Sequence, residues 1–142
     1  MSEVYLGNPN LKKANTPVQF TEEQVIEFLK CRENPVYFAN KYIKIVSLDE
    51  GLTQFHPYHF QEKLINNFHA NRFNICKMPR QTGKSTTVVS YLLHYAVFND
   101  SVNIGILANK AATARELLQR LQTAYENLPK WMQQGIISWN KG

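Results

Sequence analysis

The stretch FNICKMPRQTGKST, residues 73–86, determines how the whole 142-residue chain is interpreted. Residues 73–78 are a short apolar run that predicts a β-strand, and the residues after Gly83 predict a long helix to about Phe98. Between them stands Gly83-Lys84-Ser85, and a Gly-Lys-Ser/Thr triplet between a strand and a helix is typical of phosphate binding. The pattern predicts a phosphate-binding loop, although Met78 stands where the general motif has glycine.

Each residue of this loop has a physical task in the predicted site. Gly83 lets backbone N–H groups approach the phosphates, and the helix N-terminus adds its unpaired amides and the positive end of its dipole. Lys84 would bridge the β- and γ-phosphates of ATP, Ser85 would bind Mg²⁺ through its hydroxyl, and Thr86 would support the loop. The alternative is a chance Gly-Lys-Ser at the start of a solvated helix.

Upstream of the loop, the sequence predicts helices. Residues 1–20 are rich in Asn, Pro and Lys, and we expect an extended arm with little regular structure. Thr21 begins a capping box, which predicts a helix to about Arg32. Pro35 and Pro57 each suit the first turn of a further helix.

Downstream of the loop, strand and helix signals alternate. Residues 101–108 predict a second, largely buried strand, and residues 111–128 predict an amphipathic helix. Residues 136–139 predict a strand that enters a turn at residues 140–142, and this open hairpin suggests a truncated chain. The alternation predicts an α/β fold with a parallel sheet and flanking helices, preceded by a small helical subdomain. Residues 72–142 would be the start of an incomplete core.

Composition narrows the class of protein. The chain has 44% hydrophobic and 19% charged residues, as globular rather than disordered proteins do. No apolar run approaches the ~20 residues of a membrane span and no signal-peptide core is present, so we expect an intracellular protein. Cys31 and Cys76 have no partner at metal-ligand spacing, so we expect reduced, buried and inert thiols. The net charge of +5 raises a DNA-binding hypothesis without deciding it.

The loop resembles the modified Walker A sequence of the large terminase subunit, the ATPase that packages DNA into the capsids of tailed bacteriophages. In that family an Arg and a Gln precede Gly-Lys-Ser/Thr, as Arg80 and Gln81 do here. Further similar segments cover most of the chain, namely residues 9–15, 30–32, 36–39, 60–61, 105–108 and 139–142, with Lys110. The chain therefore resembles the N-terminal part of such a subunit.

The resemblance implies a P-loop NTPase fold of the additional-strand ATPase class and assigns roles to residues. Arg80 would act in cis on the γ-phosphate and, with Lys84, serve catalysis, while Ser85 would be the metal ligand. Gln61, in the helical segment 21–71, matches the glutamine of the family's adenine-recognition region, whereas its helical spacing alone favours an exposed polar residue. The implied nucleotide-binding residues are Gln61, Arg80, Gln81, Thr82, Gly83, Lys84, Ser85 and Thr86.

The function implied by the resemblance is ATP hydrolysis coupled to translocation of double-stranded viral DNA into a procapsid. The implied partners are the DNA, the capsid portal and the small terminase subunit, with no membrane, in the host cytoplasm and transiently at the portal. A homo-oligomer is expected on the portal. A helicase-like P-loop ATPase and a non-catalytic nucleotide-binding fragment are the alternatives. Residues 101–108 lead into Asn109-Lys110 and supply no Walker B or catalytic acid, so we expect this chain alone to be inactive or nearly so as an ATPase.

Other polar residues give weaker signals. His56 and His59 could share a metal, but no carboxylate or Cys cluster accompanies them, so we expect surface residues. Scattered basic residues are more often solvated than bound to DNA, which makes DNA contact a minority interpretation for Lys12, Lys13, Lys110, Arg115 and Arg120.

Overall fold

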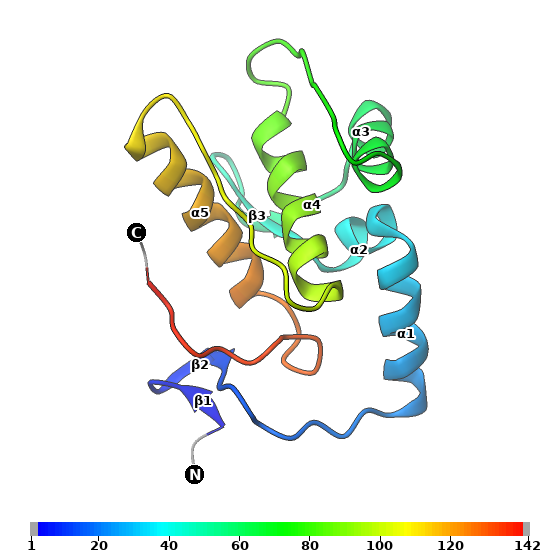
Figure 1. Ribbon diagram of the computed structural model, residues 1–142, viewed down its shortest axis with the longest axis vertical. Helices are drawn as coiled ribbons and strands as arrows, with labels where there is room; N and C mark the ends of the chain where they lie inside the picture. The colour runs from blue at the N-terminus through cyan, green and yellow to red at the C-terminus, as the bar shows by residue number, and fades with distance from the viewer. Residues whose placement is uncertain (1–2, 141–142) are drawn as a thin grey trace.

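A central helix, α4 (Lys84–Phe98), organises the computed structural model, which describes residues 3–140. Figure 1 shows α5 on one side of α4 and the helices α1, α2 and α3 on the other. Two small antiparallel sheets complete the described part of the chain, and α4 contacts α2, α3 and α5 directly. The other elements are β1 (Val4–Tyr5), β2 (Asn8–Lys12), α1 (Glu22–Glu33), α2 (Pro35–Tyr42), β3 (Lys44–Ser47), β4 (Gly51–Gln54), α3 (His59–Ala70) and α5 (Ala111–Glu126).

The helix starts follow local capping chemistry that the sequence displays. Thr21 Oγ1 accepts a hydrogen bond from the Gln24 N–H at 3.2 Å, and Gln24 Oε1 accepts one from the Thr21 N–H at 3.1 Å. This is the predicted capping box of α1, which satisfies two backbone donors at the helix end. Pro35 is the first residue of α2, as predicted, and the Asn34 side chain caps it by accepting from the Tyr37 N–H at 3.0 Å.

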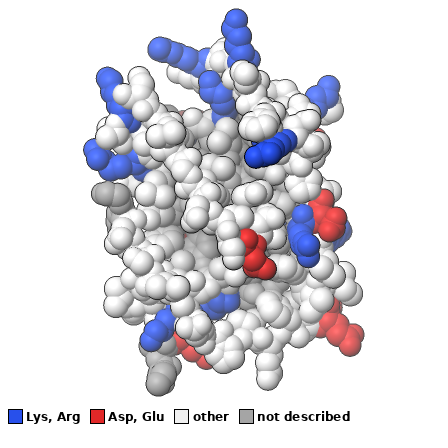
Figure 2. Space-filling view, in the orientation of Figure 1, with Lys and Arg blue, Asp and Glu red and all other residues white. Residues whose placement is uncertain are grey.

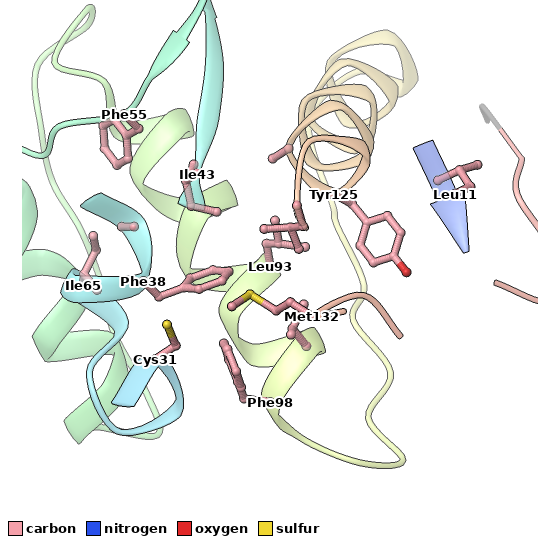
Figure 3. Close-up of a cluster of buried hydrophobic side chains, with 14 residues drawn as sticks. Leu11, Cys31, Phe38, Ile43, Phe55, Ile65, Leu93, Phe98, Tyr125 and Met132 are labelled. Carbon is pink, nitrogen blue, oxygen red and sulfur yellow. The ribbon is translucent and has the colours of Figure 1, made fainter. Parts of the chain in front are cut away.

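The core forms where α4 meets α2, α3 and the loop after α5. Figure 3 shows Phe38, Leu93, Phe98 and Met132 converging there from different parts of the chain. The Phe38 ring lies edge-on to the Phe98 ring, with centroids 5.2 Å apart. Burying a side chain of this size stabilises the fold by about 1.5–3 kcal/mol, so the aromatic cluster is a main attachment of α2 to α4.

The parallel sheet and the additional-strand P-loop fold predicted from the sequence are wrong for this structure. Residues 73–78 and 101–108 are extended but belong to no strand, and their backbones pair with no other described segment. They do not pair with each other either, and Asn74 and Cys76 of the first segment and residues 103–105 of the second line one cavity over α4. None of their side chains is buried: Ile75 and Leu107 are 100% and 97% exposed, and Cys76, Met78, Val102 and Ile106 are half-buried. The described chain is a small α/β domain.

The pairing that does exist is antiparallel and local. The strands β3 and β4 form a hairpin around residues 48–50, with Ile45 opposite Thr53. The predicted strand at residues 136–139 is reduced to a single parallel bridge between Lys13 and Ile136. Part of the turn predicted at residues 140–142 lies outside the described residues.

The N-terminal arm is more regular than predicted, because it is tied to the other end of the chain. Its strands β1 and β2 pair with each other, and Gln133 anchors them. Gln133 Oε1 accepts from the Lys12 N–H at 3.1 Å, and its Nε2 donates to the Asn10 carbonyl at 2.9 Å. Gly135 lies so close to the backbone of Ala14 that a side chain there would collide with it. Residues 3–16 are thus docked, not free.

Helix α1 carries the apolar residues Val25, Ile26, Phe28 and Leu29, of which Phe28 packs against the core. Val25, Ile26 and Leu29 are largely exposed, whereas Cys31 is fully buried. The Glu27 carboxylate joins α1 to α2 by accepting hydrogen bonds from Tyr37 and Tyr42 hydroxyls and from Lys41 Nζ, at 2.9, 2.7 and 2.6 Å. This charge-assisted cluster, rather than contact between aliphatic side chains, therefore holds α1 against α2.

Candidate anion site at the start of helix α4

The loop of residues 79–86 turns sharply before α4. Thr82 Oγ1 donates to the Pro79 carbonyl at 3.0 Å, which closes the turn. Gln81 and Gly83 both adopt left-handed backbone conformations, with φ of 60° and 70°. Gly83 is the N-cap of α4 and no side chain caps the helix, so its first N–H groups lack a side-chain acceptor. Such a free helix N-terminus, with its positive dipole end, attracts anions.

The side chains of the loop are accessible cations and hydroxyls. Arg80 and Lys84 are exposed, and neither makes an ion pair with any residue between 3 and 140. Ser85 and Thr86 are half-buried in the first turn. Sequence reasoning missed Thr87, which is buried and donates from Oγ1 to the Gly83 carbonyl at 2.8 Å, so it holds the turn in place.

Gln61 lies against this loop although it is 21 residues from its partner there. It is 3% exposed and contacts the loop, so the exposed position that helical spacing alone favours is wrong. Its Oε1 accepts from the Tyr58 N–H at 2.8 Å, and its Nε2 donates to the Thr82 carbonyl at 3.2 Å. The amide fixes the start of α3 and the loop to each other. One N–H and one lone pair remain for another partner.

An exposed aromatic pair beside Gln61 was also missed. The Tyr58 and Phe60 rings are stacked, with centroids 6.0 Å apart and planes 12° from parallel. Both remain substantially exposed at the start of α3. The clustering of aromatic residues after Pro57 is the sequence signal that could have identified them.

Positive charge gathers at the loop end of the molecule. Figure 2 shows Lys and Arg side chains projecting at the top of the view, where Figure 1 places the loop before α4. Lys77, Arg80 and Lys84 belong to this segment and are exposed. Opposed by few acidic side chains on this face, they produce a local field that favours an anionic ligand.

The remaining predicted residues form no common site. His56 and His59 are exposed, and residues 3–140 contain no group of three or more metal-ligating side chains. Arg120 is paired with Glu116 on α5 at 2.7 Å, whereas Lys12 and Lys13 belong to the arm. Cys31 is buried as expected, and burial raises the pKa of its thiol to about 12, while Cys76 is only half-buried.

The chain matches no known protein-family model. Within residues 3–140, none of the helices has both the length and the apolar character that crossing a membrane requires.

Proposed function

We propose that the chain is the ATP-binding part of a viral DNA-packaging motor of the large-terminase type. The observation that carries the proposal is the uncapped N-terminus of α4 behind left-handed Gly83, flanked by the unpaired cations Arg80 and Lys84. A triphosphate supplies the negative charge that such a site lacks. The local turn, which does not depend on a paired sheet, supports this function.

In the proposed complex each residue acts on a defined part of the nucleotide. Backbone N–H groups of Lys84, Ser85 and Thr86 hold the phosphates, and the Lys84 ammonium lies across the β- and γ-phosphates. Arg80 reaches the γ-phosphate and offsets negative charge as the terminal bond breaks. Mg²⁺ neutralises phosphate charge, and the Ser85 hydroxyl is the side chain of this loop that fits it as a ligand.

Gln61 supports the adenine assignment and offers a route for coupling. Its remaining donor and acceptor match the edge of adenine, while its bond to the Thr82 carbonyl ties that contact to the loop. Nucleotide occupancy would therefore be felt in α3 as well as in the loop. The coupling of hydrolysis to translocation of double-stranded DNA, and the portal, small-subunit and homo-oligomeric contacts, rest on the terminase resemblance.

Calorimetric titration of the chain with Mg²⁺–ATP tests the proposal. Lys84→Ala should weaken binding at least tenfold, because a charge-assisted phosphate contact contributes about 1.5–3 kcal/mol. Lys130→Ala is the matched control, since Lys130 is an exposed cation after α5 and does not belong to this loop. Equal affinities for Lys84→Ala and the parent chain would remove the phosphate assignment.

A further inference from the structure

A cavity lies between the N-terminal arm and the segment after α5, away from the loop before α4. It has a volume of about 420 Å³, within the size range of ligand sites. Its aromatic walls come from three parts of the chain. The Phe20 ring meets the Trp131 ring edge-on at 6.3 Å, and Phe28 of α1 lies 6.4 Å from Phe20. The cavity therefore offers flat apolar surfaces to a ligand.

Among the described residues that line this cavity, Lys12 has the single charged side chain. Its backbone is fixed, because its N–H donates to Gln133 Oε1 at 3.1 Å and its carbonyl accepts from the Ile136 N–H at 2.8 Å. Its ammonium makes no ion pair within residues 3–140, and partial burial lowers the pKa of Lys12. A half-buried cation without a counter-ion is incompletely solvated. A carboxylate that pairs with it would replace the stabilisation that water no longer provides.

The rim of the cavity favours a polypeptide over a free small acid. Residues 17–20 belong to no helix or strand, and the backbone groups of residues 18–20 make no hydrogen bond to another described residue. An extended segment running beside them could pair with these groups, as peptides do along exposed backbone edges. One lysine suits the single charge of a carboxylate better than a phosphate.

We propose that this cavity binds an acidic–aromatic segment of a partner protein. An aromatic side chain packs against Phe20 and Trp131, and the carboxylate of a neighbouring Asp or Glu pairs with Lys12. The site is separate from the proposed ATP site, so its occupant does not depend on the nucleotide assignment.

The blocked dipeptide N-acetyl-Phe-Asp amide, titrated calorimetrically into the whole chain, tests the proposal. N-acetyl-Phe-Asn amide is its uncharged counterpart, and 3-phenylpropionate is the small-acid counterpart. We expect the Asp peptide to bind at least about tenfold more tightly than either, because only it offers both the ion pair and the backbone contacts. Equal binding of the Asp and Asn peptides, or no binding of either at millimolar concentration, would overturn the proposal. Equal binding of 3-phenylpropionate would overturn the choice of a polypeptide.

Variants of neighbouring lysines locate the charge contact. Lys12→Gln should abolish the preference for Asp over Asn, and Lys12→Arg should retain it. Lys13→Gln is the matched control, because Lys13 is exposed and does not line the cavity. The indole N–H resonance of Trp131, identified with Trp139→Phe, should shift on binding. A shift confined to Trp139 would refute the location of the peptide in this cavity. If Lys12→Gln fails to fold, the comparison of the Asp and Asn peptides on the parent chain still tests the proposal.

Discussion

Replacing Gly83 by alanine probes the contact on which the α4 loop depends. Gly83 has a φ of 70°, and an L-residue held in this left-handed region is destabilised by about 1–2 kcal/mol. The new Cβ would also collide with Gln61 Nε2, which must withdraw from the Thr82 carbonyl. Losing that hydrogen bond and leaving a buried amide unpaired costs a further 1–3 kcal/mol, roughly. We expect Gly83→Ala to lower the free energy of unfolding by about 2–5 kcal/mol.

Gly51→Ala separates the two contributions. Gly51 has nearly the same φ, 71°, but no heavy atom lies within 4 Å of the position its Cβ would occupy. This variant should lose only the conformational part, about 1–2 kcal/mol. Urea unfolding followed by circular dichroism measures both losses. In a double-mutant cycle, Gln61→Ala should remove most of the excess penalty of Gly83→Ala. Equal losses for the two glycine variants, or no coupling between Gln61 and Gly83, would refute the reasoning.

Two further predictions concern the core and the arm. Burial lowers the pKa of His94 from 6.5 to about 4, so the unfolded chain takes up a proton before the folded one does. The free energy of unfolding should then be insensitive to this group above about pH 7 and fall by up to about 3 kcal/mol between pH 6.5 and 4. Urea titrations across this range should show a smaller loss for His94→Gln. The same dependence of stability on pH in His94→Gln and the parent chain would contradict this prediction. Gly135→Ala should push the arm off residues 133–136 and speed hydrogen exchange of the Lys12 and Ala14 amides, because its Cβ would overlap the Ala14 backbone. Gly105→Ala, with open space around its Cβ, should leave that exchange unchanged, and equal protection in both variants would argue against a tight arm contact.

Local chemistry made most of the helices predictable. The capping box at Thr21 and the proline at Pro35 act within one helical turn, so a short sequence contains all the information. Helix α5 likewise begins at Ala111 as the amphipathic pattern predicts. These features require no knowledge of distant residues.

The strands were not predictable in the same way, because pairing needs a neighbour. Residues 73–78 and 101–108 have strand-like composition, but no described segment pairs with them. The hairpin of β3 and β4 was missed, although alternating apolar residues around Asp49-Glu50-Gly51 are a hairpin signal. Short apolar runs do not distinguish these cases by themselves.

The candidate site shows the same division between local and distant information. The Gly83-Lys84-Ser85 triplet placed the loop at a helix start from sequence alone, and α4 begins there. The burial of Gln61 was not predictable from helical spacing, because it depends on a loop 21 residues further along the chain. Only the family resemblance brought the two together.

The Gln133 anchor has a consequence for the order of folding. Its bond to the Lys12 N–H closes a loop of 121 residues, and the chain entropy of such a closure opposes folding by roughly 4 kcal/mol before any contact compensates for it. Contacts of this sequence separation slow folding, whereas the helix pairs around α4 involve shorter closures. The arm should therefore dock late, onto helices that have already assembled. The docked arm and the segment after α5 hold each other in place and together line the aromatic cavity. Release of either segment would therefore open this cavity.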